Sequence, residues 1–239
     1  PGPSGPSGAS EQGSSVTAVF VKICGITCAE DALLATALGA DALGFVFAPS
    51  RRQVSETVVR DIVGQLPHDV LTVGVFRNTG KTRVVEIVNR IGLKAAQLHG
   101  RESPATCRWV AERVPLTIRA LPAGSPDLQR FDEYDADLLL LDSAAPGSGE
   151  VFDWALAEGA PANRRTLLAG GLTPDNVGSA IEQVDPFGVD VSTGVESGPG
   201  RKDPRLLRAF ITTARAAQPV RYEGDVERQP FDWQEEEWR

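Results

Sequence analysis

Eight short aliphatic runs in a 239-residue chain are the feature that most constrains its fold. They recur roughly every 20 to 30 residues, which is the length of one strand, one helix and two loops. The runs span residues 20–23, 42–47, 71–76, 95–98, 116–120, 138–141, 166–169 and 188–191. Several of them are apolar throughout instead of alternating, which is typical of parallel strands that are covered on both faces.

The segments between the runs carry the signals of helix ends. Thr27 and Glu30 have the spacing of a capping box, and Gly39 stands where that helix is expected to end. An apolar stripe over residues 84–91 is followed by Gly92. Three further helix starts are indicated by an N-cap residue before a proline, at Ser103-Pro104, Thr173-Pro174 and Asp203-Pro204. The chain therefore alternates strand and helix.

Eight strand–helix cycles in about 200 residues predict a compact (β/α)8 barrel, the TIM barrel, as a single α/β domain. An open doubly wound sheet is the alternative, because alternation alone does not show whether the sheet closes. We expect the barrel domain to span residues 17–218. A flexible Gly/Pro/Ser-rich arm over residues 1–16 and an acidic tail over residues 219–239 are expected to flank it.

The charge of the chain bears on its partners. The net charge is −8, and from Arg221 onward seven acidic residues stand against three arginines. An acidic chain is a poor partner for nucleic acid or for an anionic membrane surface. No apolar run approaches the roughly 20 residues that a membrane-spanning helix needs. Because much of the negative charge lies in the tail, the domain can still bind a small anion, and we expect a small-molecule partner.

The cysteines bear on metal binding and on compartment. Cys24, Cys28 and Cys107 form no CxxC pair, and only two histidines are available to complete a metal site. This argues against a zinc site and against a disulfide framework. Unpaired cysteines are typical of a reducing compartment, so we expect a cytoplasmic protein without a bound metal. Cys28 and Cys107 fall in predicted helices, where inert packing is the favoured interpretation.

In a (β/α)8 barrel the active site lies at the carboxyl ends of the strands. Cys24 follows the first run directly, Arg52 lies in the loop after the second, His99 follows the fourth and Asp142 the sixth. Each residue also has a structural interpretation when taken alone. A cysteine at a strand end is most often a core residue, an aspartate can cap a loop, and a histidine can be a satisfied structural group.

The loops after the seventh and eighth runs have a composition suited to an anion. Gly170 and Gly171 let backbone N–H groups approach a ligand, and Thr173-Pro174 predicts a helix start directly after them. The loop one strand later consists of Ser192, Thr193 and Gly194. Since these two loops form the usual phosphate site of this fold, we predict a bound phosphate group there. Two ordinary tight turns are the alternative.

Eight motifs occur in order along nearly the whole predicted domain. They are VKICGIT (21–27), GADALGFVFAPSRRQVS (39–55), VGVFRN (73–78), AAQLHG (95–100), LLLDS (139–143), GSGEVFDW (147–154), LAGGLTPDNV (168–177) and GVDVSTGVESGPGRKDPRLLRAFI (188–211). With these motifs the chain resembles the phosphoribosylanthranilate isomerase family, the (β/α)8 enzymes of tryptophan biosynthesis. The resemblance leaves only the two tails uncovered.

The resemblance implies roles for single residues. The cysteine of the KICG motif is the general base of that family and corresponds to Cys24, and the aspartate of the LLLD motif is its general acid and corresponds to Asp142. The arginine that pairs with the substrate carboxylate corresponds to Arg52, with Arg51 as a less certain neighbour. Other side chains expected to bind substrate are Lys22, His99 and Asp190.

The implied reaction is an Amadori rearrangement. It converts N-(5′-phosphoribosyl)anthranilate to 1-(2-carboxyphenylamino)-1-deoxyribulose 5-phosphate, with neither a metal nor an organic cofactor. Opening the furanose needs an acid at the ring oxygen, and removing the C2′ proton needs a base on the other side of the sugar. Cys24 and Asp142, on the first and sixth runs, meet that need. We expect Arg52 or Lys22 to favour the thiolate of Cys24.

Two other functions stay open. A non-catalytic phosphoribosyl-binding barrel would keep the phosphate loops but has no need of Cys24 or Asp142. The related aminoimidazole-carboxamide isomerase of histidine biosynthesis uses an aspartate where this chain has Cys24, so a dual isomerase that also serves histidine biosynthesis is the second alternative. The oligomeric state is open between monomer and homodimer, since the family includes both.

Overall fold

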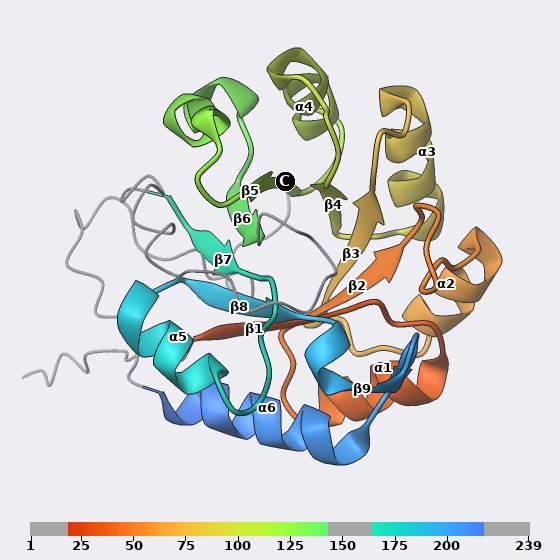
Figure 1. Cartoon of the computed structure of the whole chain (residues 1–239). Helices are drawn as coiled ribbons and strands as arrows, with labels where there is room; N and C mark the ends of the chain where they lie inside the picture. The colour runs from red at the N-terminus through yellow and green to blue at the C-terminus, as the bar shows by residue number, and fades with distance from the viewer. Residues whose placement is uncertain (1–18, 143–163, 218–239) are drawn as a thin grey trace, which may run out of the picture.

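Eight parallel strands form a closed barrel in a computed structural model of the protein, which describes residues 19–142 and 164–217 (Figure 1). The strands are β1 (Phe20–Cys24), β2 (Ala42–Val46), β3 (Leu71–Phe76), β4 (Ala95–Leu98), β5 (Thr117–Pro122), β6 (Leu138–Asp142), β7 (Thr166–Leu168) and β8 (Gly188–Val191). The barrel closes where β8 pairs with β1, with Phe20 opposite Gly188. The predicted (β/α)8 barrel is confirmed, and the open doubly wound sheet is wrong.

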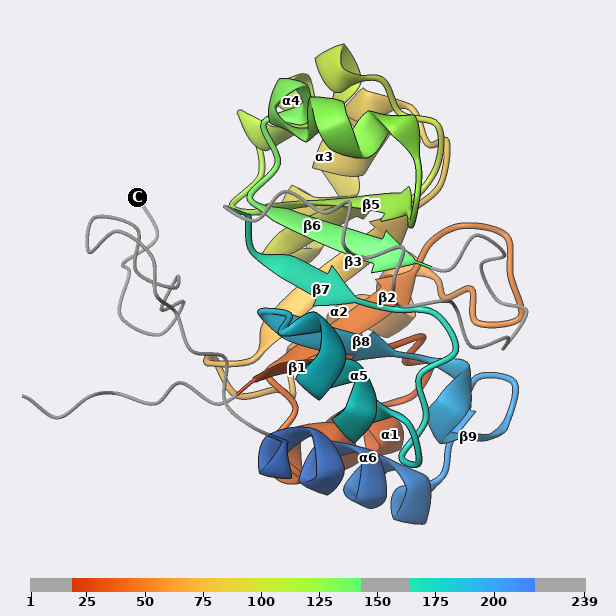
Figure 2. The ribbon, with the colours of Figure 1, turned by 60° about the vertical axis from the view of Figure 1, so that its left-hand side comes forward.

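Helices surround the barrel on its outside (Figures 1 and 2). They are α1 (Ala29–Ala37), α2 (Glu56–Val63), α3 (Lys81–Ile91), α4 (Pro104–Ala111), the 3-10 helix η1 (Pro126–Tyr134), α5 (Val177–Val184) and α6 (Pro204–Ala216). After β8 the chain adds the short 3-10 helix η3 (Thr193–Val195) and an antiparallel pair, β9 (Glu196–Gly198) and β10 (Arg201–Lys202). In Figure 2 the strand arrowheads share one end of the barrel, and β9 lies at that end.

All eight predicted runs are strands, with shifts of one or two residues at their ends. β1 extends to include Cys24, β6 extends to include Asp142, and β5 runs from Thr117 to Pro122. The two residues predicted to be catalytic are therefore the last residues of their strands. They are held by the backbone hydrogen bonds of the sheet, which makes their positions more rigid than those of loop residues.

Alternate strand residues build two separate apolar cores. One core joins the outward-facing strand residues to helix residues such as Val59 and Phe210. The other consists of inward-facing residues of the strands or directly next to them, with Phe187 packed against them. Its buried members are Phe20, Ala42, Leu71, Val73, Ala95, Leu116, Ile118, Ala120, Leu138, Leu140, Leu167 and Ala169. The buried polar residues Lys22 and Gln97 follow two of these core members, Phe20 and Ala95, by two positions along their strands. They therefore lie closer to the carboxyl end of the barrel.

Two of the predicted helix caps are wrong. The residue before α1 is Cys28, and no side chain caps that helix. Thr27 instead donates its hydroxyl hydrogen to the carbonyl oxygen of Gly200, at 2.5 Å. The predicted helix start at Thr173 is also wrong, because its N–H donates to Oδ1 of Asn176 at 2.8 Å and α5 begins only at Val177. In both places a side-chain hydrogen bond outside the helix replaces the expected cap.

The caps at Ser103 and Asp203 are confirmed. The Ser103 hydroxyl accepts from the N–H of Thr106, and the Asp203 carboxylate accepts from the N–H groups of Arg205 and Leu206. In the described part of the chain no helix is both long and apolar enough to cross a membrane. The predicted arm over residues 1–16 and the predicted acidic tail over residues 219–239 lie outside the described residues.

Replacing Asp203 tests its assignment as the N-cap of α6. Asp203→Ala leaves two N–H groups of the first turn without their acceptor, so we expect a loss of about 1 kcal/mol in the free energy of unfolding. Urea denaturation measures it as a lower midpoint at unchanged slope. Asp203→Asn is the matched control, because an amide oxygen still caps the helix. Equal stability of the alanine variant and the parent would contradict the assignment.

Candidate active site at the carboxyl end of the barrel

Lys22 and Cys24 lie two residues apart on β1, so both side chains point into the barrel. Lys22 is fully buried, and its Nζ donates to Oδ1 of Asp190 at 2.7 Å. A Cβ added at Gly44 of β2 would stand 2.9 Å from Cys24 Sγ and 3.1 Å from Lys22 Nζ. The missing side chain at Gly44 therefore provides the space in which the thiol and the ammonium group meet.

Burial dominates the electrostatics of Cys24. Desolvation raises the pKa of the Cys24 thiol above its ordinary value, while the positive charges of Lys22 and Lys202 act against it and Asp190 reinforces it. The charge of Lys22 acts in the expected direction, toward the thiolate, but burial outweighs it. Burial therefore favours the neutral thiol over the thiolate.

Lys22 keeps its charge in spite of its burial. Desolvation lowers the pKa of Lys22, but the attraction of Asp190 and Cys24 is stronger and holds this pKa above its ordinary value. An ammonium group is therefore fixed beside the thiol of Cys24. It stabilises the thiolate whenever the thiol gives up its proton.

Arg52 reaches the same end of the barrel from the loop between β2 and α2. Its Nε and Nη2 donate to the two carboxylate oxygens of Glu196, each at 2.7 Å, and Nη2 also donates to Thr193 Oγ1 at 3.1 Å. A Cβ at Gly25 would stand 2.5 Å from Cδ of Arg52 and 2.9 Å from Oγ of Ser192. Arg52 thus lies over the residue that follows Cys24, with its fork held by a carboxylate of the protein.

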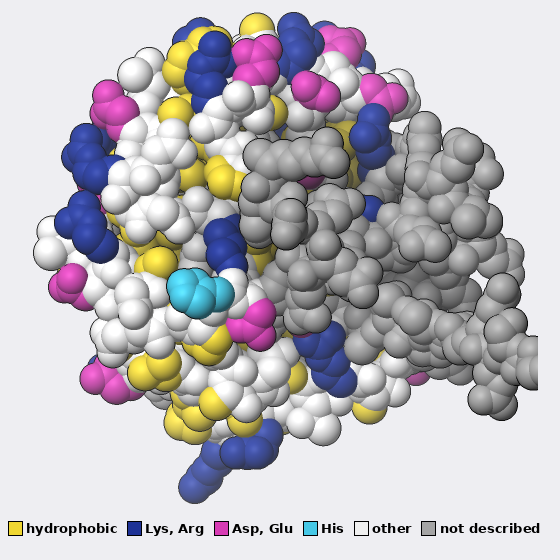
Figure 3. All heavy atoms as spheres, turned by 180° about the vertical axis from the view of Figure 1, so that it is seen from behind, with side chains coloured by type: hydrophobic (Ala, Val, Ile, Leu, Met, Phe, Trp, Pro, Cys, Tyr) yellow, Lys and Arg dark blue, Asp and Glu magenta, His cyan; other side chains and the backbone are white. Residues whose placement is uncertain are grey.

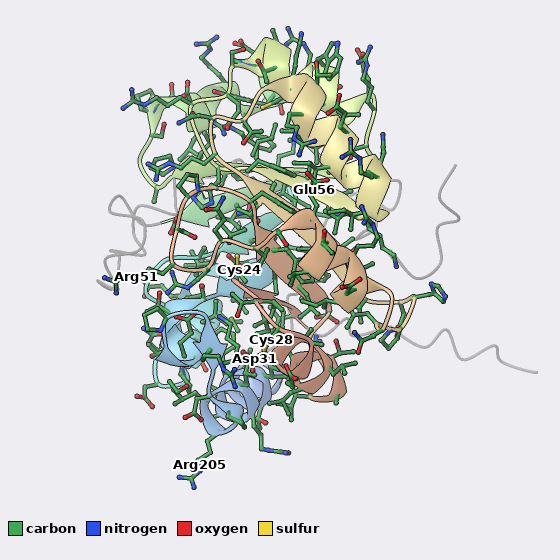
Figure 4. The ribbon with its side chains drawn as sticks, turned by 90° about the vertical axis from the view of Figure 1, so that its right-hand side faces the viewer. Cys24, Cys28, Asp31, Arg51, Glu56 and Arg205 are labelled. Atoms are coloured by element: carbon green, nitrogen blue, oxygen red, sulfur yellow. The ribbon has the colours of Figure 1, made fainter. Side chains whose placement is uncertain are left out.

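Arg51 does not share this position. Its side chain is exposed, and in Figure 4 it points outward at the edge of the molecule, away from Cys24. The structure therefore distinguishes the two neighbouring arginines, which the sequence left as alternatives. In the same view Cys28 lies beside Asp31, in the region of α1 and apart from Cys24.

Lys202 is a site residue that sequence reasoning missed. It is 4% exposed, and its Nζ donates to the carbonyl oxygens of Cys24 and Ser192 at 2.7 and 3.1 Å. The same Nζ lies 3.1 Å from Glu196 Oε1. One ammonium group thus connects the end of β1, the loop after β8 and the Arg52–Glu196 pair. Lys202 and Glu196 both lie in the last matched motif, but no local pattern indicates that they are buried.

His99 and Asp142 form a second cluster in the barrel mouth. His99 Nε2 lies 3.1 Å from Asp142 Oδ2, and His99 Nδ1 lies 3.1 Å from Nε2 of Gln97. Asp142 ends β6 and Cys24 ends β1, with β7 and β8 between them in the barrel. The two clusters therefore face each other across the mouth. Gln97 was also missed, because a lone glutamine in an apolar strand carries no signal of its own.

The loops after β7 and β8 are in direct contact. Gly170 and Gly171 have φ angles of +87° and +66°, in the left-handed region that favours glycine. A Cβ at Gly194 would overlap the carbonyl oxygen of Leu172 and stand 3.2 Å from Cα of Thr173. Because the N–H of Thr173 is taken by Asn176, the predicted helix-start donor is not available to a phosphate there. The structure brings the two predicted loops together but gives that donor another partner.

The described residues, 19–142 and 164–217, contain no metal site. No three His, Cys, Asp or Glu side chains come together there, and all three cysteines are free. On the face shown in Figure 3, outside the grey atoms, Lys and Arg are interspersed with Asp and Glu instead of forming a continuous basic surface.

Comparison with known proteins agrees with this geometry. Residues 21–213 match the family model described as N-(5′-phosphoribosyl)anthranilate (PRA) isomerase. The N-(5′-phosphoribosyl)anthranilate isomerase of Desulforudis audaxviator is 50% identical over 202 residues, covering 83% of this chain and 98% of that protein.

Two solved structures are similar in fold as well as in sequence. The phosphoribosyl anthranilate isomerase of Thermus thermophilus superposes with a TM-score of 0.78 at 42% identity, covering 83% of this chain and 99% of that one. A phosphoribosyl anthranilate isomerase in complex with reduced 1-(o-carboxyphenylamino)-1-deoxyribulose 5-phosphate gives 0.74 at 42% identity, with the same coverage. The chain belongs to the N-(5′-phosphoribosyl)anthranilate isomerase family.

Proposed function

We propose that this protein catalyses the Amadori rearrangement of N-(5′-phosphoribosyl)anthranilate to 1-(2-carboxyphenylamino)-1-deoxyribulose 5-phosphate in tryptophan biosynthesis. The observation that carries the proposal is the placement of Cys24 and Asp142, one base and one acid, at the ends of strands that face each other across the barrel mouth. Family membership supports the same reaction. The non-catalytic barrel is disfavoured, because it needs neither group.

Asp142 serves the first step as the acid. It donates a proton to the furanose ring oxygen while the bond between that oxygen and C1′ breaks and the nitrogen lone pair forms a Schiff base at C1′. The Asp142 carboxylate left by this transfer lies 3.1 Å from Nε2 of His99. A hydrogen bond from the ring N–H to the carboxylate stabilises the state after proton donation.

Cys24 serves the second step as the base. Once its thiol proton has passed to solvent, the Cys24 thiolate removes the proton from C2′. The electron pair of that C–H bond forms the C1′–C2′ double bond of an enolamine, and the Schiff-base nitrogen becomes neutral. Return of a proton to C1′ and loss of the C2′ hydroxyl proton then give the ketone, so that no atoms or electrons are gained or lost overall. The positive charges of Lys22 and Lys202 act to lower the Cys24 pKa, which favours the thiolate that serves as the base.

Arg52 and the two glycine-rich loops are proposed to bind the ends of the substrate. Nη1 of Arg52 donates to none of the described residues, and it is therefore the edge of the guanidinium open to the anthranilate carboxylate. The phosphate group is proposed to lie between Gly170-Gly171 and the loop of Ser192, Thr193 and Gly194. The close backbone contact of these loops supports this assignment.

The wider setting is also proposed. The isomerase domain spans residues 17–218, and the protein works in the cytoplasm on a small phosphorylated substrate. The three free cysteines support a reducing compartment. A second activity in histidine biosynthesis is the alternative, and an assay of the purified protein with the corresponding substrate tests it.

Removing the acid or the base tests the mechanism. Cys24→Ala and Asp142→Asn should each lower kcat by at least about 100-fold with little change in KM, because each group acts in a proton transfer. Conversion is followed as loss of the aryl-amine substrate. Cys28→Ala and Cys107→Ala are the matched controls and should keep kcat near that of the parent. Turnover near the parent's in either test variant would remove that residue from the mechanism.

Arg52 and Arg51 give a paired test of carboxylate binding. Arg52→Ala should lower kcat/KM by an amount equal to about 1.5–3 kcal/mol, because a hydrogen bond to a charged group is lost. Arg52→Lys should recover only part of it, since an ammonium group cannot hold the Glu196 fork and a second carboxylate together. Arg51→Ala, the control at an exposed neighbour, should change little. A reversed ranking of the two alanine variants would contradict the assignment.

Gly194 tests the phosphate site. Gly194→Ala places a carbon atom on the Leu172 carbonyl oxygen and forces the loops after β7 and β8 apart. We expect KM and the competitive inhibition constant of inorganic phosphate to rise by about 10-fold or more, a loss of about 1.4 kcal/mol in binding. Gly198→Ala is the matched control, because its added Cβ meets nothing within 4 Å. Unchanged phosphate inhibition in Gly194→Ala would place the phosphate elsewhere.

A further inference from the structure

Gln97 is a buried polar residue that the proposed mechanism leaves without a role. It is 1% exposed and lies in β4, in register with Val75 of β3 and Ile118 of β5. His99 follows two residues later, so the two side chains point to the same side of the sheet, into the barrel. Nε2 of Gln97 lies 3.1 Å from Nδ1 of His99. Its Oε1 is buried and has no hydrogen-bond partner among the described residues.

The orientation of the Gln97 amide determines which nitrogen of His99 carries the proton. An amide nitrogen donates hydrogen bonds and cannot accept them, so the contact with Gln97 requires a bare Nδ1 with its lone pair directed at the amide. A neutral imidazole then carries its single proton on Nε2. Nε2 is the atom that lies 3.1 Å from Asp142 Oδ2, so the ring N–H donates to the carboxylate.

The opposite orientation of the Gln97 amide would place the proton on the other ring nitrogen of His99. If Oε1 faced Nδ1, that nitrogen would carry the proton and Nε2 would present a lone pair to Asp142. A neutral His99 would then accept a hydrogen bond from protonated Asp142 and would oppose the proton transfer to the substrate. The two orientations therefore have opposite consequences for an acid at Asp142.

We propose that Gln97 is a positioning residue that holds neutral His99 as its Nε2–H tautomer, so that His99 donates a hydrogen bond to Asp142 when Asp142 has given its proton to the substrate. The inference rests on the proposed function for its catalytic meaning. The tautomer itself is a property of the ligand-free protein. Gln97 touches His99 and acts through it, whereas Asp142 meets the reacting atoms.

The tautomer can be measured directly, because the chain contains only two histidines. His68→Gln removes the second one, which is exposed and lies outside the barrel mouth. In this background, ¹⁵N NMR of the neutral imidazole in ligand-free protein should show a protonated Nε2 and an unprotonated Nδ1. A protonated Nδ1 with a bare Nε2 would overturn the proposal.

Two substitutions of Gln97 then test the cause. Gln97→Met removes the donor at similar volume, and the ¹⁵N shifts should move toward a mixture of the two tautomers. Gln97→Glu offers an acceptor, so Nδ1 should become protonated. Retention of the pure Nε2–H tautomer in both variants would overturn the role of Gln97. Because the glutamate variant keeps a side chain of the same shape, it supplies the test even where the methionine variant fails to fold.

Kinetics separate this role from substrate binding. Gln97→Met should lower kcat by about 10- to 100-fold at nearly constant KM, because it weakens an acid without removing a substrate contact. A large rise in KM with unchanged kcat would show that Gln97 binds substrate instead. If the parent protein itself fails to convert phosphoribosylanthranilate, the proposed function fails, while the NMR result on the tautomer still stands or falls on its own.

Discussion

Lys22 of β1 and Asp190 of β8 are register partners at the seam where the last strand of the barrel meets the first. Their ion pair is 2.7 Å long, and the side chains are almost completely withdrawn from water. Breaking such a pair by removing one partner costs about 3–5 kcal/mol, because the other charge stays buried. The pair also fixes an ammonium group beside Cys24. The stability of the barrel seam and the proton affinity of the candidate base therefore depend on the same contact.

A second buried charge connects the loops above that seam. Lys202 holds the carbonyl oxygens of Cys24 and Ser192 and lies within 3.1 Å of Glu196, which in turn holds the fork of Arg52. Movement of the Arg52 loop is thus coupled to the end of β1 and to the loop after β8. The proposed carboxylate contact, the base and the proposed phosphate loop share one network. Substitutions at its centre, Glu196 or Lys202, should therefore affect several steps together.

The acid side of the barrel mouth has a separate support. Glu102 and Arg119 form a buried ion pair, with Arg119 Nη1 2.7 Å from Glu102 Oε2 and 2.9 Å from the carbonyl oxygen of Leu98. Arg119 Nη2 also donates to the carbonyl oxygen of Gly100, at 3.0 Å. These bonds hold the chain on both sides of His99. The backbone at His99 is therefore held in place, and Gln97 and Asp142 contact the two nitrogen atoms of its ring.

Local sequence patterns determined the barrel strands and two of the helix caps, whereas they favoured closure of the sheet without deciding it. The aliphatic runs predict each of the eight barrel strands within one or two residues, because parallel strands in a barrel are buried on both faces and must be apolar over a short span. Asp203 and Ser103 cap their helices as predicted, since a cap is made within three residues. Thr27 and Thr173 failed as caps, because Thr27 bonds to Gly200 far along the chain and Asn176 bends the chain after Thr173.

The candidate site also has features that the sequence predicted and features that only the tertiary structure shows. The sequence by itself placed Cys24, Asp142 and Arg52 at strand ends or in the loops beyond them, because the order of strands decides which residues reach the carboxyl end of a barrel. Only the tertiary structure decided that Glu196 holds Arg52 and that Lys202 donates to the carbonyl oxygen of Cys24. The same is true of the contacts of His99 with Gln97 and with Asp142. Most of these contacts join residues 43 to 178 positions apart. The pKa of Cys24 likewise depends on burial, which is created only when the whole barrel has closed around it.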